Sequence, residues 1–241
     1  MTSPTIPRRA QRLSELGDRR FDLLVIGGGI TGAGIARDAA RRGLAVALVE
    51  REDFAAGTSS RSSRLIHGGV RYLEHGYLHL VFEASRERRR LLELAPHLVR
   101  PMRFTWPVYK GARVPRWQLA AALTLYDALA LFKNVGRHHR LGRAGVLAAE
   151  PALATDGLRG GAAYWDASTD DSRLTLANAI DAAHTSATVI NHAEVTALTR
   201  ASTNGPVDGA VVRDLLGGTE IRVQARIVLN ATGPWTDEIL Q

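Results

Sequence analysis

The hydrophobic pattern of the chain is clearest near its start, where two apolar runs enclose an amphipathic segment. Residues 21–26 form a short continuous apolar run, which is typical of a parallel strand buried on both faces. A helix is predicted at roughly 31–42, and Gly43 stands where a glycine commonly ends a helix. Residues 44–49 form a second apolar run. The order strand, helix, strand predicts an α/β fold that begins with a parallel pair of strands.

The rest of the chain continues this alternation of helical and extended patterns. Residues 1–20 lack the apolar core of a signal peptide and are expected to form a mobile arm or a short amphipathic helix. Helices are predicted at 83–94, with Arg86 to Arg90 solvated, at 117–132, and at 175–187 after an N-cap at Asp171 or Ser172. Strands are predicted at 188–191 and 194–198, in a hairpin of 209–215 with 220–223, and in one more buried strand at 226–230.

A glycine-rich turn joins the first strand to the first helix. Gly27, Gly29 and Gly32 form the pattern G-x-G-x-x-G. The first glycine allows a tight turn, the second allows a pyrophosphate to approach the backbone, and the third allows close packing of helix on sheet. The free N–H groups and positive dipole end of the helix would face the phosphates. The pattern predicts dinucleotide binding, with a plain structural turn as the alternative.

Glu50 stands at the carboxyl end of the second strand. A carboxylate there can accept hydrogen bonds from both ribose hydroxyls of an adenosine, and it would repel a 2′-phosphate. NADP is therefore disfavoured, whereas FAD and NAD both remain.

A polar loop follows at residues 51–72. It contains Thr58 and four serines that could hydrogen-bond a ligand or could simply form a flexible surface loop: Ser59, Ser60, Ser62 and Ser63. The loop leads into His67, a glycine pair, Arg71 and Tyr72. Arg71 offers a planar fork for a phosphate or carboxylate, Tyr72 a hydroxyl, and His67 a group that titrates near neutral pH.

Composition narrows the chemistry. The chain of 241 residues has no cysteine, which excludes disulfides, thiol catalysis and thiolate metal sites, and no metal site is expected. The formal charge of +7 comes almost wholly from arginine. A coding bias toward arginine explains this charge, and an anionic substrate or membrane surface is the alternative. No nucleic-acid motif accompanies the charge.

Residues 117–132 form the most hydrophobic predicted helix. The helix is too short to span a bilayer and carries Asp127. Its flanks are rich in tryptophan, arginine, lysine and histidine, which suits a helix at a membrane surface. A buried core helix with a solvated basic rim explains the pattern equally well.

Several motifs together resemble one enzyme family. GGGITGAGIARDAA, the later GTSSRSSRLIHGGVRYLE, YWDA followed by DDSRL, and NATGPWTD are similar to those of the FAD-dependent glycerol-3-phosphate dehydrogenases. The resemblance runs from residue 21 to the end of the chain. It implies a Rossmann-like FAD-binding domain of the glutathione-reductase and D-amino-acid-oxidase type, with part of a substrate domain.

The implied domain order is an arm at 1–20, a first segment of the FAD-binding domain at 21–100, a partial substrate or membrane-facing domain at 101–165, and a second FAD-binding segment at 166–241. Family members continue well past Gln241, so the resemblance predicts a truncated chain. The cofactor contacts that it implies, together with the glycine turn and Glu50, are Gly27, Gly29, Gly32, Glu50, Ser59, Ser60, Ser62, Ser63, Val195, Thr232 and Gly233.

The resemblance implies oxidation of sn-glycerol 3-phosphate to dihydroxyacetone phosphate, with FAD as cofactor and quinone as electron acceptor. Arg71 is expected to bind the substrate phosphate or stabilise the alkoxide, supported by Tyr72, and His67 is the best available base. A cytoplasmic protein is expected, with peripheral binding to the inner face of the cell membrane and a homodimer among the expected assemblies. The alternatives are a non-catalytic FAD-binding fragment and an amine or amino-acid oxidase of the same fold, with a NAD-dependent dehydrogenase as a more distant one.

Overall fold

The structure is a computed structural model that describes residues 8–131 and 135–239. The chain forms two compact units. The first unit combines the two ends of the chain, residues 1–62 and 171–241, and the second consists of residues 63–170. The sequence predicts domain boundaries between residues 100 and 101 and between residues 165 and 166. The boundaries between the two units lie instead at Ser62/Ser63 and Asp170/Asp171.

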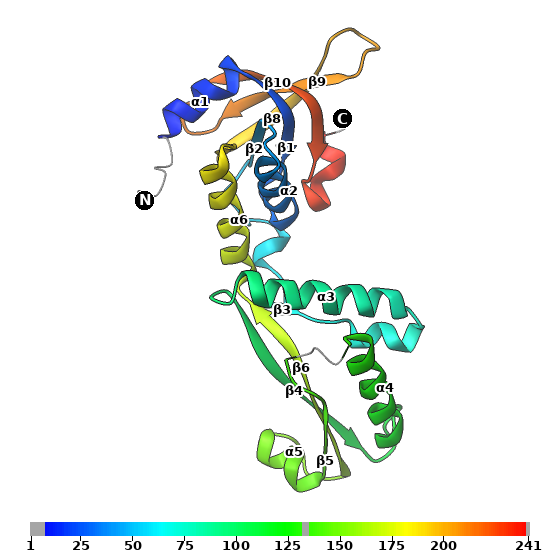
Figure 1. The fold of residues 1–241 in the computed structure, drawn as a ribbon. Coiled ribbons are helices and arrows are strands. Elements are labelled where there is room, and N and C mark those ends of the chain that lie inside the picture. Colours follow the sequence, from blue (N-terminus) through cyan, green and yellow to red (C-terminus); the bar gives the residue numbers. More distant parts are fainter. Residues whose placement is uncertain (1–7, 132–134, 240–241) are drawn as a thin grey trace. The chain divides into compact units, whose positions relative to one another are not determined.

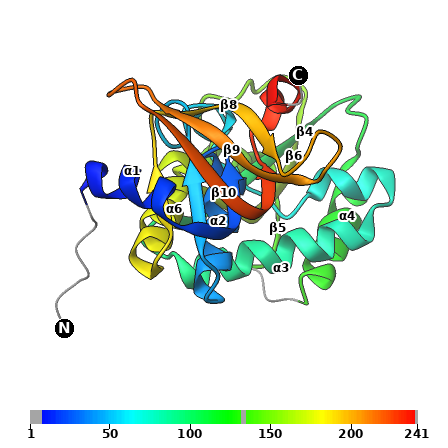
Figure 2. The ribbon, with the colours of Figure 1, turned by 90° about the horizontal axis from the view of Figure 1, so that it is seen from above.

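The first unit is built on a six-stranded sheet with the order β7-β2-β1-β10-β9-β8 (Figure 1). Strands β7, β2, β1 and β10 are parallel. Strands β9 and β8 extend the sheet beyond β10 in antiparallel fashion (Figure 2). The elements are α1 (Arg9–Asp18), β1 (Arg20–Ile26), α2 (Ile30–Arg41), β2 (Val46–Val49), the 3₁₀ helix η1 (Thr58–Ser60), α6 (Asp171–Thr185), β7 (Thr188–Ile190), β8 (Ala193–Arg200), β9 (Val207–Asp214), β10 (Glu220–Asn230) and the 3₁₀ segment η3 (Gly233–Ile239).

Strand β1 is buried on both faces, as its continuous apolar run predicts. Leu24 and Ile26 belong to one core cluster, with Leu16 of α1 and residues of β2, β9 and β10. Leu23 and Val25 belong to the other cluster, which the alanines of α2 and α6 complete. Small alanine side chains let these two helices approach the sheet closely. The strand therefore lies in the centre of a layered α/β unit, and the predicted α/β fold class is confirmed.

Helix α2 ends in the way its sequence predicts. Gly43 has a φ of 83°, in the left-handed region. Its N–H donates to the carbonyl of Ala40 at 2.9 Å, and the N–H of Leu44 donates to the carbonyl of Ala39 at 3.2 Å. These two bonds are those of a Schellman C-cap, which ends the helix before β2.

Strand β10 corrects the predicted C-terminal strands. Residues 220–223 and 226–230 were expected to form two separate strands, but they form one. Its first half pairs with β9 in antiparallel register, with Val223 opposite Ala210, and its second half pairs with β1 in parallel register, with Leu229 opposite Val25. The second half is less buried than predicted, since Ile227 is 61% exposed.

Two alternatives were predicted for the N-terminal segment, a mobile arm and a short helix, and the structure shows the helix, α1. Leu16 is fully buried in the core. Arg9 donates to the carbonyls of Asn191 and His192 and pairs with Asp214 at 2.5 Å. These contacts hold α1 against the turn between β7 and β8.

The second unit contains a smaller antiparallel sheet. Strand β6 is at its centre, with β4 along one edge and β3 and β5 on the other (Figure 1). Pro101 and Pro107 occur within β4, which fits a strand that pairs on one side only among the described residues. The elements are β3 (Leu65–Ile66), the 3₁₀ helix η2 (Val70–His75), α3 (Leu78–Leu94), β4 (Val99–Tyr109), α4 (Arg116–Leu129), β5 (His139–Leu141), α5 (Arg143–Ala149) and β6 (Leu158–Thr169).

Two predicted helices differ from those observed. Helix α3 begins at Leu78, earlier than the predicted residue 83, and Arg88 within it is buried rather than solvated. Helix α6 begins at Asp171 itself, so neither Asp171 nor Ser172 stands before the helix as its N-cap. No helix in residues 8–131 and 135–239 is both long and apolar enough to cross a membrane.

The packing of α6 on α2 yields a testable contribution to stability. Asp181 of α6 accepts hydrogen bonds from Arg37 at 2.5 Å and from Arg41 at 2.8 and 2.9 Å. We expect Asp181→Asn to lower the free energy of unfolding at neutral pH by about 0.5–1 kcal/mol in urea denaturation, because these pairs are partly exposed.

The pH dependence of the same substitution follows from the pKa of Asp181. Hydrogen bonding from Arg41 lowers this pKa, partial burial opposes the effect, and Arg37 lowers it further. The stabilisation is therefore present above about pH 4, the pKa of an unfolded Asp, and is lost as the pH falls through the lowered folded pKa. Asp38→Asn is the matched control, since Asp38 is 63% exposed and pairs only with the i+4 residue Arg42 among its described ion pairs. If Asp38→Asn lowers the free energy of unfolding as much as Asp181→Asn does, the pairs of Asp181 with Arg37 and Arg41 do not stabilise the packing of α6 on α2.

Candidate functional site

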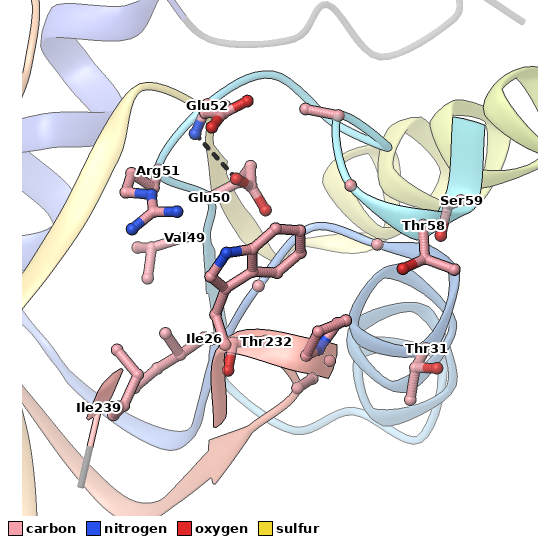
Figure 3. Close-up of a pocket in the computed structure, with 18 of the residues that line it drawn as sticks. Ile26, Thr31, Val49, Glu50, Arg51, Glu52, Thr58, Ser59, Thr232 and Ile239 are labelled. Carbon is pink, nitrogen blue, oxygen red and sulfur yellow. Dashed lines mark hydrogen bonds between the residues drawn. The ribbon is translucent and has the colours of Figure 1, made fainter. Parts of the chain in front are cut away.

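A cavity of about 560 Å³ opens in the first unit at the carboxyl ends of β1, β2 and β10 (Figure 3). In an open α/β sheet this edge is where ligands bind. The walls come from the turn into α2, the segment after β2, the start of β8 and the segment after β10. The lining residues are Ile26, Gly27, Gly29, Ile30, Thr31, Val49, Glu50, Arg51, Glu52, Ala56, Gly57, Thr58, Ser59, Arg61, Ala193, Glu194, Val195, Ala231, Thr232, Gly233, Pro234, Trp235, Glu238 and Ile239.

The glycine turn brings three backbone segments into close contact. Gly27 has a φ of 108°, and a Cβ on it would lie 2.6 Å from the carbonyl oxygen of Ala231. A Cβ on Gly32 would overlap the carbonyl oxygen of Gly27. Gly29 precedes α2 and lines the cavity. The turn can therefore be built only with glycine at 27 and 32, and it leaves the N-terminus of α2 at the cavity wall.

Glu50 stands at the end of β2, where the sequence places it, and its carboxylate is already engaged. Oε2 accepts the N–H of Gly28 at 2.6 Å. Oε1 accepts the N–H of Glu52 at 2.8 Å (Figure 3). A carboxylate offers about four acceptor positions, so two remain for hydroxyl donors. The two backbone bonds hold the side chain in place at the cavity.

The serine-rich loop contributes one residue directly to the helix end. The hydroxyl of Ser59, in η1, accepts the N–H of Ile30 at 2.9 Å. This bond satisfies one of the unpaired N–H groups at the start of α2. The other predicted serines lie elsewhere: Ser60 donates to the carbonyl of Gly57 at 3.1 Å, and Ser62 donates to Asp171 at 2.5 Å.

Segment η3 forms the opposite wall of the cavity. A Cβ on Gly57 would lie 2.9 Å from the ring of Trp235, so the indole packs against the η1 loop. Glu238 pairs with Arg51, just after β2, at 3.1 Å. Neither Trp235 nor Arg51 is among the predicted site residues, although NATGPWTD contains the tryptophan, because nothing in that motif indicates which loop the ring contacts.

Most of the predicted cofactor-binding residues meet at this cavity. Those that line it are Gly27, Gly29, Glu50, Ser59, Val195, Thr232 and Gly233. The hydroxyl and N–H of Thr232 both donate to the side chain of Asn230, at 2.6 and 3.1 Å. Gly32 lies behind the turn, and Ser60, Ser62 and Ser63 are not in the lining.

The predicted catalytic residues lie in the second unit. His67 and Tyr72 are both exposed, and their rings stand edge to face with centroids 6.3 Å apart. Gly69 has a φ of 77°, and a Cβ on it would overlap the ring of Tyr72. Arg71 belongs to η2, but its side chain lies outside the described part of the structure.

A buried polar network supports this glycine pair. Asp166 of β6 accepts the N–H of Gly68 at 2.9 Å and the hydroxyl of Tyr126 at 2.7 Å, and it pairs with Arg88. Burial raises the pKa of Tyr126, so its phenol stays protonated and able to donate. A Cβ on Gly68 would lie 2.7 Å from both Arg88 and Ser85. The sequence marks Asp166 by its YWDA motif, but no local pattern indicates its partners, which come from α3 and α4.

Within residues 8–131 and 135–239, no group of three or more histidine, aspartate or glutamate side chains could hold a metal ion.

Comparison with known proteins decides the family. The model of the FAD dependent oxidoreductase family (DAO) matches residues 22–241. The chain belongs to this family. The fold class predicted from the motifs agrees with the match, since the glycine turn and the segment after β10 are both within it.

Curated relatives of this chain are named as glycerol-3-phosphate dehydrogenases. The aerobic enzyme of Staphylococcus saprophyticus is 43% identical over 96% of this chain and 42% of its own length. The mitochondrial enzyme of Saccharomyces cerevisiae is 43% identical over 99% of this chain and 37% of its own length. The enzyme of Mycobacterium leprae is 46% identical over 96% of this chain and 39% of its own length. The chain thus spans about two fifths of the relatives' length. The predicted family resemblance is confirmed.

Solved structures give the same family at the level of the fold. The glycerol-3-phosphate dehydrogenase of Bacillus halodurans, solved with FAD, has a TM-score of 0.74 and 35% identity over 95% of this chain and 38% of that one. The glycine oxidase of Bacillus cereus has a TM-score of 0.60 and 25% identity over 91% and 58%.

Gly32 and Gly34 provide a matched pair for testing the glycine turn. Both lie in α2, but a Cβ on Gly32 would overlap the backbone of Gly27, whereas a Cβ on Gly34 would meet nothing within 4 Å. We expect Gly32→Ala to lower the free energy of unfolding by roughly 2–3 kcal/mol through overpacking. Gly34→Ala should raise it by roughly 0.5–1 kcal/mol, because alanine favours the helix.

Urea denaturation of the two variants checks the pair. If Gly32→Ala unfolds at the same urea concentration as the unsubstituted protein, helix and strand do not meet as closely as the structure has them.

Proposed function

We propose that this protein takes part in the FAD-dependent oxidation of sn-glycerol 3-phosphate to dihydroxyacetone phosphate, with the electrons passing to quinone. The observation that carries the proposal is 43–46% identity, over nearly the whole chain, to enzymes named as glycerol-3-phosphate dehydrogenases. The structure adds a cavity whose residues suit a dinucleotide cofactor.

The first unit is proposed to hold the adenosine diphosphate end of FAD. The turn at Gly27 and Gly29 has no side chain to obstruct a pyrophosphate, and the N-terminus of α2 favours negative charge there. Glu50 has acceptor positions left for the ribose hydroxyls. Val195, Thr232 and Gly233 supply backbone and small side chains on the facing wall. These residues fit the cofactor by their chemistry.

Bound FAD would supply the acceptor for the hydride that leaves C2 of the substrate. Within the second unit, Arg71 is proposed to bind the substrate phosphate or the developing alkoxide, and Tyr72 to support it by hydrogen bonding. His67 is proposed to take the proton of the C2 hydroxyl, since it is exposed and an imidazole nitrogen can act as a general base. The network around Asp166 holds the backbone from which these residues extend.

The second unit is also the proposed membrane-facing part. In α4, Leu119 and Leu123 are buried, whereas Trp117 is 74% and Leu125 is 43% exposed. An exposed tryptophan beside basic residues suits binding to an anionic membrane surface, where quinone is available. A cytoplasmic location with peripheral membrane binding, and a homodimer, belong to the same proposal.

A second candidate is an FAD-binding chain without turnover. The cavity of the first unit, whose residues suit a dinucleotide, is compatible with this candidate as well. An amine or amino-acid oxidase is the third candidate, supported by the likeness of fold to glycine oxidase.

The visible spectrum of the purified chain, after incubation with FAD and removal of the excess, tests these candidates. We expect a retained flavin spectrum that bleaches without oxygen on addition of sn-glycerol 3-phosphate, because hydride transfer reduces the flavin. Glycerol and glycine are the controls, since the first lacks the phosphate and the second is an amino-acid oxidase substrate.

Each result selects one candidate. If the flavin is retained but neither sn-glycerol 3-phosphate nor glycine bleaches it, the result supports the FAD-binding chain without turnover. If glycine bleaches the flavin, the result supports the amino-acid oxidase. A protein that retains no FAD contradicts the cofactor assignment itself.

A further inference from the structure

We propose that Arg61 binds the diphosphate of the dinucleotide in the cavity of the first unit and makes the site select ligands by their number of phosphates. This inference rests on the proposed role of the cavity in holding FAD. Arg61 lies in the serine-rich loop and is exposed, and it lines the cavity two residues after Ser59. Ser59 holds the loop to the start of α2 through the N–H of Ile30.

The labelled charged and hydroxyl side chains of the cavity lie on different sides. Figure 3 shows Glu50, Arg51 and Glu52 on one side and Thr31, Thr58 and Ser59 on the other. The first side carries carboxylates that suit the hydroxyls of an adenosine. The second side consists of hydroxyls, backbone N–H groups and the start of a helix, which suit phosphate oxygens.

The charge balance shows why the second side needs a cation. The lining contains four carboxylates, Glu50, Glu52, Glu194 and Glu238, but two guanidinium groups, those of Arg51 and Arg61. A diphosphate brings about two further negative charges, one for each phosphate. The dipole of α2 offers about half a positive charge. The helix end alone therefore does not balance the ligand.

Of the two arginines, Arg61 is the one without an ion pair to another described residue. Arg51 is held by Glu238 at 3.1 Å, on the acidic side. Arg61 forms no ion pair with any residue in 8–131 or 135–239. Its planar fork can bind two phosphate oxygens at once. Affinity should therefore rise from adenosine to AMP to ADP, and Arg61 should carry much of the rise.

Binding of ADP and adenosine to the full chain, measured by calorimetry without magnesium, tests the inference. We expect Arg61→Gln to weaken ADP binding about fivefold to tenfold and to leave adenosine binding unchanged. The fall of ADP affinity with rising salt should also become shallower, because one charge contact is lost. Arg222→Gln is the matched control, since Arg222 is exposed in the same unit but outside the cavity.

The result that overturns the inference is ADP binding by Arg61→Gln within twofold of the unsubstituted chain. An equal loss for adenosine and ADP would also overturn it, because Arg61 would then support the shape of the site and not the phosphates. Arg61→Lys should recover part of the lost ADP affinity, since it restores the charge without the fork. If the unsubstituted chain retains FAD and the substitution has no effect, the inference fails while the proposed function stands; if the chain binds neither FAD nor ADP, both fail.

Discussion

The arrangement of the first unit depends on a backbone contact between α2 and the end of β1 that leaves no room for a side chain. Helix α2 meets the end of β1 so closely that a Cβ on Gly32 would overlap the carbonyl of Gly27, and Gly27 itself lies against the backbone of Ala231. Three segments therefore meet backbone to backbone. Because the side chains are absent there, the N-terminus of α2 and the carboxyl ends of β1 and β10 all reach the same cavity. A ligand at this edge of the sheet therefore contacts backbone N–H groups, carbonyls and small side chains, and no bulky side chain of the glycine turn blocks it.

Segments from both ends of the chain complete that arrangement. β1 takes its neighbours from residues that follow it closely, in β2, and from residues about two hundred positions later, in β10. One wall of the cavity therefore comes from residues 26–61 and the other from residues 193–239. The ion pair of Arg51 with Glu238 and the contact of Gly57 with Trp235 join the two walls. The cavity exists only once both parts of the chain are folded together.

The second unit also contains a glycine with no room for a side chain, but there the neighbours are buried polar residues. Gly68 has no room for a side chain because Arg88, Tyr126 and Ser85 lie beneath it, and Asp166 binds its N–H. A buried charge pair is costly unless its hydrogen bonds are satisfied. Here the carboxylate of Asp166 has three donors, from the backbone, a phenol and a guanidinium. The backbone between His67 and Tyr72 is therefore held by residues from three separate elements.

The sequence by itself determined the features that local physics governs. The apolar run of β1, the Schellman end of α2 at Gly43, the glycine pattern and the acid at the end of β2 all follow from interactions over a few residues, and each is found where it was predicted. Most of the predicted cofactor residues also come together, since family motifs mark them. Only the tertiary structure decided which long-range partners these residues have. It joined the two predicted C-terminal strands into the single strand β10 and buried Arg88 against Asp166. It also brought Trp235 to the η1 loop and placed Arg61, which forms no ion pair with another described residue, in the lining of the cavity. These outcomes depend on packing between segments far apart in the chain, and no local pattern carries that information.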